Sequence, residues 1–456
     1  MEVFRAIGVE KEVLRQSAPQ GTVSHTAWYT SIRLEPILLG RARELNPDGL
    51  RHSTEVLAVT EEAEKVLVTV RNADGTREDW EAKYVLGADG GRFMADQLGI
   101  AWEGEKDIFD MVSAHFHAPL SSVHPNSNAF ISWFINPSLG GSIKSGYLYP
   151  LGPFPSNPET EECVSHRYVG SIVTEHFRSG GGKVFLLGDA AHQIPPWGAL
   201  GMNTGLQDAF NLIWKLAFIL RGNVKDPKRL LDTDEEERRP IAKSVAYSSP
   251  WRSHGDAMDK AIGASPAQTS EVNQAAMDAY FDKSHPDYAK KQIDVGKAQT
   301  VLDGEFCALG TEIGWFYPSV DANNEGETTR HDGQIREVGS FDNIFYHPST
   351  IPGHHLPHFW LQRDGNTVSS RDLLDPRKLL LLGSSADVEA RLGQGHPLIK
   401  VELIDCPEGW QDTDALWGKL CPIGTDGVVI VRPHGIVVWR SQLNDAAQAD
   451  FLGQFV

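Results

Sequence analysis

The segment that most restricts the fold is residues 183–222, KVFLLGDAAHQIPPWGALGMNTGLQDAFNLIWKLAFILRG. It opens with an uncharged run, VFLLG, that is typical of a buried strand. It closes with the apolar spacing of a long amphipathic helix, over about 203–220, which Gly222 ends. The order of strand, loop and helix predicts an α/β fold.

The loop inside this segment has the chemistry of a ligand site. Asp189 follows the strand directly, at the end where open α/β sheets bind their ligands. Two prolines, Pro195 and Pro196, fix the loop, while Gly198 and Gly201 remove side chains so that a flat ring can lie against the backbone. The helix start offers unpaired N–H groups that suit an electron-rich ring edge. The residues alone equally allow an ordinary corner with Asn203 or Thr204 as N-cap.

Alternating and helical patterns extend the α/β organisation on both sides. Residues 2–16 and 34–45 have helical apolar spacing, with Val3, Phe4, Ile7 and Val13 on one face of the first. VLAVT and KVLVTV alternate like strands, and the ADG at 73–75 is placed for a hairpin turn. YVLGADGGR at 84–92 reads as a strand with a tight turn, and aromatic-rich strands between about 108 and 150 predict an inserted antiparallel sheet.

The C-terminal part has a different texture. Residues 223–300 are polar and mainly helical in pattern, whereas β-rich runs begin at about 335 and end in VVIVRPHGIVVWR. Pro433, His434 and Gly435 supply the turn of a final hairpin. The expected domains are residues 1–107, an inserted antiparallel sheet at 108–165, residues 166–300, and a separate α/β domain at 330–456.

The charge balance excludes several classes of protein. The net charge is −19 and 41% of residues are apolar, which argues against a disordered tail, a collagen and a basic nucleic-acid binder. The expected partners are small molecules. No apolar stretch reaches the length of a signal peptide core or a membrane span, so we expect a soluble cytoplasmic protein. The four cysteines, Cys163, Cys307, Cys406 and Cys421, lie too far apart in sequence to indicate a disulfide scaffold or a zinc site.

Four stretches resemble one family. GDAAHQIPPWGALGMNTGLQDAFNLIWKL is similar to the second flavin-binding motif of the FAD-dependent aromatic hydroxylases, the class A flavoprotein monooxygenases. YVLGADGGR resembles their Asp-Gly motif, and LLDTDEEERRPIA (230–242) resembles the helix that follows the flavin motif in the phenol hydroxylase branch. The tail, from PGHHLPHFWL (352–361) onward, resembles the thioredoxin-like C-terminal domain of that branch, without redox cysteines.

The resemblance implies a Rossmann-like FAD/NAD(P)-binding domain and a set of cofactor residues. Asp189 would accept hydrogen bonds from the ribityl chain, and Asp89 and Arg92 would serve the first Asp-Gly site. The residues that would surround the isoalloxazine are Gly188, Pro195, Pro196, Gly198, Gly201, Met202 and Asn203.

The same resemblance implies an activity. NAD(P)H would reduce FAD, and a flavin hydroperoxide formed with dioxygen would hydroxylate a phenolic or polyketide-like aromatic compound, in secondary metabolism or aromatic degradation. The protein would contribute positioning, a dry pocket and electrostatics. The sequence assigns no catalytic acid or base. The resemblance is compatible with a homodimer.

The chain departs from this pattern in the flavin domain. It has no GxGxxG, the glycine-rich turn that holds a pyrophosphate, and only 100 residues separate Asp89 from Asp189. Phe93 stands where the family usually has a small serine. The FAD-binding domain is therefore expected to be incomplete. Two alternatives stay open: a truncated, non-catalytic homologue that dimerises with a complete one, and a flavin-independent enzyme on the same fold.

Other residues are weaker candidates. Phe130, Trp133, Phe134, Tyr147 and Tyr149 lie where the family builds its substrate pocket, although strand aromatics are more often core. Of these, Trp133, Tyr147 and Tyr149 are the expected substrate residues. The histidines His354, His355 and His358 lack a carboxylate partner, so no metal is expected. We expect His192 to be a buried structural histidine and residues 235–239, EEERR, to be a solvated helix face with local ion pairs.

Overall fold

The structure is a computed structural model of the whole chain. It describes residues 2–16, 31–115, 132–134, 136, 138, 146–148, 163–248, 251–265, 267–306, 308–317, 330–331, 334–335, 345–385, 396–422, 424, 427–442 and 455. The chain folds into two compact units, and the segments that carry Asp89 and Asp189 both belong to the second. The first unit comprises Met1–Thr54, Lys106–Gly170 and Ser249–Phe306, and the second comprises Glu55–Glu105, Ser171–Ser248 and Cys307–Val456.

The first unit is mainly helical. The predicted N-terminal helix is in fact two short helices, because Gly8 interrupts it with a φ of +80°. Phe4 and Val13 are buried as their spacing predicts, and helix 34–45 is confirmed, although Leu45 at its end is exposed. Ile262, Met277 and Val295 form a small core between three later helices. The helices are α1 (Glu2–Ala6), α2 (Glu10–Gln16), α3 (Ser31–Leu45), α7 (Trp251–Ile262), α8 (Ser270–Phe281) and α9 (Tyr288–Phe306).

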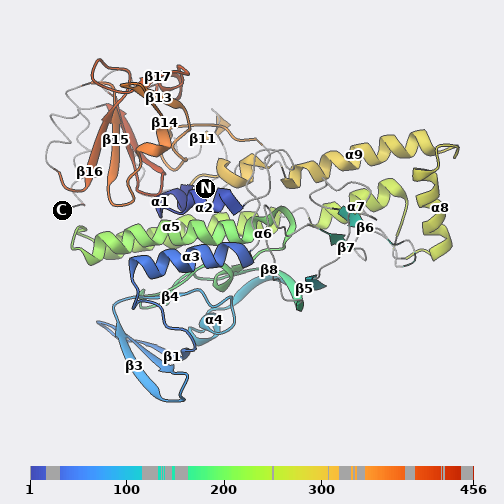
Figure 1. Cartoon of the computed structure of the whole chain (residues 1–456), viewed down its shortest axis with the longest axis horizontal. Coiled ribbons are helices and arrows are strands. Elements are labelled where there is room, and N and C mark those ends of the chain that lie inside the picture. Colours follow the sequence, from blue (N-terminus) through green and yellow to red (C-terminus); the bar gives the residue numbers. More distant parts are fainter. Residues whose placement is uncertain are drawn as a thin grey trace. The chain divides into compact units, whose positions relative to one another are not determined.

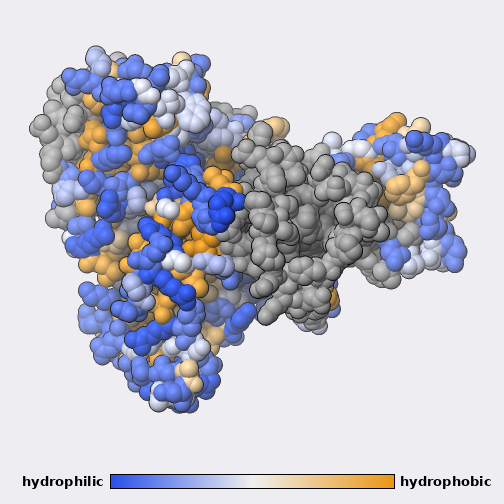
Figure 2. All heavy atoms as spheres, viewed as in Figure 1, coloured by the Kyte–Doolittle hydropathy of each residue, from blue (hydrophilic) through white to orange (hydrophobic). Residues whose placement is uncertain are grey.

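The second unit begins with an antiparallel meander of three strands, β1 (Glu55–Glu61), β2 (Val66–Arg71) and β3 (Arg77–Ala82). The predicted turn at 73–75 joins β2 to β3, with Gly75 at a φ of +84°. Val66, Val68 and Val70 alternate into the core, and β3 is largely exposed. Mainly hydrophilic residues accordingly cover this part of the surface (Figure 2).

A short parallel pair lies at the centre of the second unit. Strand β4 (Val85–Gly87) pairs in parallel with β9 (Val184–Leu186), with Val85 opposite Val184 and Gly87 opposite Leu186. A second, antiparallel sheet has the strand order β10-β8-β5. Its strands are β5 (Trp102–His115), β8 (Cys163–Thr174) and β10 (His192–Gln193), and β5 and β8 continue into the first unit. A small separate pair within the first unit is formed by β6 (Ser132–Phe134) and β7 (Gly146–Leu148).

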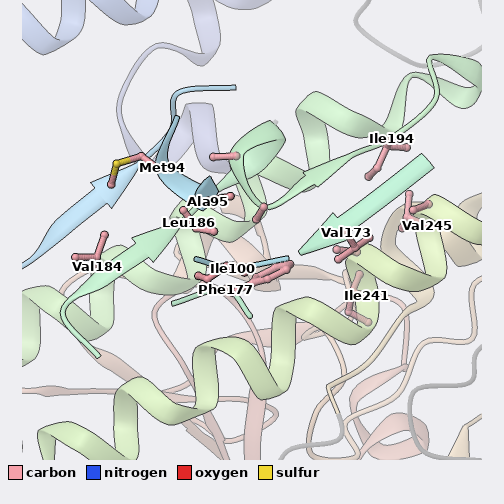
Figure 3. Close-up of a cluster of buried hydrophobic side chains, with 14 of the residues drawn as sticks. Met94, Ala95, Ile100, Val173, Phe177, Val184, Leu186, Ile194, Ile241 and Val245 are labelled. Carbon is pink, nitrogen blue, oxygen red and sulfur yellow. The ribbon is translucent and has the colours of Figure 1, made fainter. Parts of the chain in front are cut away.

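Two long helices pack beside these strands. Helix α5 (Leu200–Leu220) and helix α6 (Pro227–Ser248) run side by side in Figure 1. Ile241 and Val245 of α6 contact the same core as Val184 and Leu186 of β9, as Figure 3 shows. The short helices of this region are α4 (Met94–Gln97), η3 (Gly188–Ala190), η4 (Trp197–Ala199) and η5 (Gly310–Gly314).

The C-terminal segment holds a mixed sheet with the order β16-β15-β18-β19. Strand β15 is parallel to β16 and antiparallel to β18, and the predicted hairpin turns at Gly435, whose φ is +88°. The strands are β15 (Leu379–Gly383), β16 (Ile399–Leu403), β18 (Gly427–Val431) and β19 (Val437–Gln442). The remaining elements are β11 (Arg330–His331), β12 (Gln334–Ile335), β13 (Trp360–Arg363), β14 (Asn366–Ser369), η6 (Ser370–Leu373), β17 (Gln411–Asp412) and α11 (Trp417–Leu420).

The two faces of this mixed sheet contact different cores. Leu379 and Leu381 of β15 face Trp214 and Phe218 of helix α5. The alternate residues, such as Leu380, face a second cluster built only from C-terminal residues. One of the two cores of the mixed sheet therefore also contains side chains of helix α5.

Candidate functional site

The two Asp turns predicted from the sequence lie side by side. Because β4 and β9 are adjacent and parallel, the turns that carry Asp89 and Asp189 both begin at the same edge. Gly91, in the first turn, is so close to the second that a Cβ atom there would lie 2.8 Å from the backbone oxygen of Asp189. The absence of a side chain at Gly91 is what allows this approach.

Asp89 closes its own turn. Its Oδ2 accepts the backbone N–H groups of Arg92, Phe93 and Met94 at 2.6–3.0 Å, which caps the start of α4. Its Oδ1 is buried and has no hydrogen-bond partner among the described residues. The carboxylate thus orders the first turn and keeps one acceptor oxygen unused.

The second turn packs directly on helix α5. Gly188 has a φ of +56°, and a Cβ built on Gly205 would lie 3.0 Å from the Cα of Gly188. Two glycines facing each other let the helix approach the turn more closely than any side chain would permit. The first residues of α5 are thereby held next to Asp189.

Helix α5 starts earlier than expected, and its predicted cap is wrong. The N-cap is Ala199, with a φ of 53° and no side-chain cap bond. Asn203 and Thr204 lie inside the first turns, where they donate to the carbonyls of Ala199 and Leu200. Because the N-cap residue Ala199 makes no side-chain cap bond, the N–H groups of the first turn carry the positive end of the helix dipole.

The exposure of the predicted residues suits a cofactor that enters from solvent. Asp189, Pro196, Met202, Asn203 and Arg92 are all exposed. Gly188, Gly198 and Gly201 are half-buried, and Pro195 is buried, as expected of a residue that fixes the loop. Gly198 has a φ of 77°, a conformation that favours glycine.

These residues fit the flavin half of FAD. Asp189 offers a free acceptor for ribityl hydroxyls, the glycines leave backbone open to a flat ring, and the helix start suits its electron-rich edge. No residue of the chain is assigned to the adenylate half, because the sequence has no GxGxxG.

Behind the second turn lies a buried ionic network that the sequence analysis missed. Asp208 of α5 accepts the Gly188 N–H at 3.2 Å and contacts His192 Nε2 at 2.7 Å through Oδ2. Its Oδ1 accepts Arg238 Nε of α6 at 2.8 Å. His192 is fully buried, so its prediction as a structural histidine is confirmed.

The prediction of a solvated face at residues 235–239 is wrong for its central pair. Glu237 and Arg238 are fully buried. Glu237 binds Lys215 at 2.8 Å and also Arg432 of the C-terminal hairpin, while Arg238 contacts the Tyr317 hydroxyl at 3.2 Å. The local pattern does not indicate this burial, because the partners of both charges come from distant parts of the sequence.

A sequence signal for this network does exist. Asp208, Asn211 and Lys215 recur at helical spacing in an otherwise apolar helix, and all three are buried. Polar residues at i, i+3 and i+7 share one face, so such a stripe predicts buried partners on a neighbouring helix.

The network fixes the protonation of its acids. Burial by itself raises the pKa of Asp208, but Arg238 and His192 outweigh burial and lower that pKa to about 2. For Glu237, Arg432 and Lys215 likewise outweigh burial and lower the pKa. Asp234, which accepts Asn211 Nδ2, has its pKa raised to about 6, chiefly by burial. Asp208 and Glu237 are therefore ionised near neutral pH.

The structure describes only some of the aromatic residues and histidines that the sequence singled out. Trp133 and Tyr147 are opposite each other in the β6–β7 register, and Tyr149 and Phe130 lie outside the described residues. His354 stacks on Phe316 and His358 contacts Ser369, so these histidines make separate contacts. Among the described residues no group of three or more His, Cys, Asp or Glu side chains could hold a metal.

None of the described helices combines the length and apolar character of a membrane span.

Two known family models match this chain. The family model of the FAD binding domain matches residues 1–169 and 156–249, and that of the aromatic-ring hydroxylase C-terminal region matches residues 349–454. The first match alone covers more than half of the chain.

Curated relatives are similar to this chain over most of their length. A phenol 2-monooxygenase of a Pseudomonas strain is 27% identical, with 97% of this chain and 82% of the relative covered. A provisionally named polyketide hydroxylase of Streptomyces coelicolor is 33% identical, with 97% and 86% covered. That alignment spans 552 positions, although this chain has 456 residues, so the relative carries internal segments that this chain lacks.

The fold is also shared with solved structures. The flavin-dependent monooxygenase PieE, in complex with FAD and substrate, has a TM-score of 0.82 at 24% identity, with 99% of this chain and 90% of that chain covered. At this identity the likeness concerns the fold.

Proposed function

The chain belongs to the family of FAD-binding aromatic-ring hydroxylases, and on that premise we propose that it is an FAD- and NAD(P)H-dependent monooxygenase of a phenolic or polyketide-like aromatic compound. One atom of dioxygen enters the aromatic ring as a hydroxyl group, the other leaves as water, and NAD(P)H is oxidised. Bound FAD would supply the redox chemistry of this reaction.

One observation carries the proposal. The turns of Asp89 and Asp189 meet at the carboxyl ends of adjacent parallel strands, next to the uncapped start of helix α5. Two chemical needs of a flavin site, an acceptor for hydroxyls and a positive helix end, are therefore met within one small region.

Each part of this region has a proposed task. Asp189 binds the ribityl hydroxyls, and Gly198, Gly201, Met202 and Asn203 bound the ring. The helix start of α5 stabilises negative charge on the reduced ring through its dipole. Asp89 and Arg92 serve the first turn, where Asp89 already orders the backbone with three hydrogen bonds.

Two further assignments belong to the same proposal. The β6–β7 pair, with Trp133 opposite Tyr147, would contribute to the substrate sheet. Residues 330–456 would have a thioredoxin-like arrangement, which their mixed four-stranded sheet with one parallel pair supports.

Cofactor uptake tests the proposal directly. We expect the purified full chain to quench the fluorescence of added FAD on binding, and to oxidise NADPH faster when a phenolic substrate is present. Oxidation that does not depend on the aromatic compound would contradict the hydroxylase assignment. A chain that takes up no FAD would contradict the proposal as a whole and favour a non-catalytic partner of a complete homologue.

A further inference from the structure

The second flavin turn has its own buried support. Three hydrogen-bond donors converge on one carboxylate, that of Asp208: the Gly188 N–H, the His192 ring and the Arg238 guanidinium. Asp208, His192 and Arg238 are each at most 1% exposed. A carboxylate accepts through two oxygens, so this group suits three donors where a neutral side chain does not.

Arg238 is itself held in place. Besides Asp208 it contacts the Tyr317 hydroxyl at 3.2 Å and the Thr204 carbonyl at 3.3 Å, and its guanidinium lies over the Trp315 ring at 5.1 Å. A planar group with several donors and an aromatic face beneath it has little freedom to move. The orientation of the Asp208 carboxylate is therefore fixed from the side opposite the turn.

From this geometry we propose that Asp208, oriented by Arg238, is a positioning residue that holds the Gly188–Asp189 turn in the conformation that binds FAD. Asp208 does not touch the cofactor in this assignment. It acts through the Gly188 N–H and through His192, which lies three residues after Asp189. The inference rests on the proposed flavin site and adds to it the residues that hold its geometry.

The test compares two buried charges on the same helix. In Asp208→Asn one acceptor oxygen becomes an amide donor that faces other donors, so the cluster of three donors loses at least one bond together with the charge that strengthens the others. Lys215→Met is the matched control, because Lys215 belongs to the neighbouring ion pair with Glu237 and makes no recorded bond to the turn. Both variants should lower the thermal midpoint.

Two readouts separate positioning from general stability. We expect amide hydrogen exchange in peptides covering residues 184–194 to accelerate in Asp208→Asn and to stay unchanged in Lys215→Met. The Kd for FAD, from fluorescence titration, should rise by about ten-fold or more in Asp208→Asn, as expected for a bond to a charged group, and by less than about two-fold in the control. Arg238→Lys keeps the positive charge but loses the planar guanidinium. Its exchange rate and its Kd for FAD should lie between those of the other two variants.

The outcomes are distinct. Equal exchange rates and equal FAD Kd in Asp208→Asn and the parent protein would overturn the proposal, as would equal effects of Lys215→Met. If Asp208→Asn does not fold, Arg238→Lys decides by the same two readouts. If the parent protein binds no FAD, the proposed function fails, while hydrogen exchange still judges whether Asp208 holds the turn.

Discussion

Asp189 stands exposed at the carboxyl end of β9, where its carboxylate is free to accept hydrogen bonds from a ligand. We predict that Asp189→Ala weakens FAD binding by about 1.5–3 kcal/mol, the range for a hydrogen bond to a charged group. The measurement is a titration of FAD fluorescence. Asp48→Ala, at another exposed aspartate, is the control and should leave the titration unchanged. Identical curves for Asp189→Ala and the parent protein would refute the assigned role.

Asp234 gives the molecule a specific pH dependence. Its pKa rises from 3.8 to about 6, chiefly through burial, so between these values the folded protein keeps a proton that the unfolded chain has lost. The free energy of unfolding contributed by this group therefore falls as pH rises from about 4 to about 6 and is constant above that range.

Replacement of Asp234 should remove this dependence. We predict that Asp234→Asn matches the parent protein at about pH 4 and is more stable by about 2–3 kcal/mol at pH 7, since one pKa unit corresponds to about 1.4 kcal/mol. Urea unfolding at several pH values measures the difference. A constant difference between the two proteins across this range would show that Asp234 does not titrate with a raised pKa.

At this scale the sequence could predict the exposed residues of the site better than its buried ones. Asp89 and Asp189 follow strands within recognisable motifs, so their turns were predictable. Arg238 and Glu237 lie in a run of six charged residues, 234–239, that is typical of a surface, and their burial depends on Asp208, Lys215 and Arg432 from elsewhere in the chain. Such pairing depends on tertiary contacts that a local pattern does not contain.

Among the elements, the contact between helix α5 and the second turn depends on having no side chain at Gly205. We predict that Gly205→Ala lowers the free energy of unfolding by about 1–3 kcal/mol through overpacking and also weakens FAD binding, because the added Cβ meets the Gly188 backbone at 3.0 Å. Chemical unfolding and FAD titration measure the two effects.

The control for this change is Gly40→Ala. Gly40 lies within helix α3 and a Cβ there meets nothing within 4 Å, so the substitution should stabilise by about 1 kcal/mol through helix propensity. If Gly205→Ala stabilised the protein in the same way, the helix and the turn would not be in close contact.

Element types were more predictable than element ends. Strands β4 and β9, helix α6 and the final hairpin follow from apolar periodicity and turn residues. The start of α5 was not predictable, because Ala199 adopts a φ of 53° without any capping side chain. Gly8 likewise ends a helix whose apolar spacing continues past it, since its positive φ breaks the periodic backbone.

At the scale of the whole molecule, one hydrophobic core joins helix α5 to the C-terminal strands β15, β16, β18 and β19. Phe218 is fully buried there and packs edge-on against Trp214 and Phe455, with ring centroids 5.4 and 6.0 Å away. We predict that Phe218→Ala costs about 3–5 kcal/mol and that FAD release and unfolding of the C-terminal strands shift together.

Denaturant unfolding followed by flavin fluorescence and by circular dichroism measures this coupling. Phe281→Ala is the control, because that side chain is 68% exposed and its removal should change stability by less than about 0.5 kcal/mol. A shift of one probe without the other in Phe218→Ala would show that the two segments unfold separately.

The broad architecture could be predicted at this scale, and the shared core could not. The β-rich runs after residue 335 predicted strands there, and the structure places these strands in the same compact unit as the turns of Asp89 and Asp189. Strands β15 and β18 are buried along their whole length, which requires partners on both faces. The sequence shows the uncharged runs but does not indicate that helix α5 covers one of the faces.

The shared core joins residues that are synthesised at different times. Trp214 and Phe218 leave the ribosome long before the strands that cover them, β15 and β18, have been synthesised. Until then the apolar face of α5 has no C-terminal sheet to pack against, and exposed apolar surface of this kind promotes aggregation of nascent chains. Interrupted synthesis before β18 would leave this face uncovered, so successful production of the enzyme depends on completing the chain or on chaperones that shield the helix in the meantime.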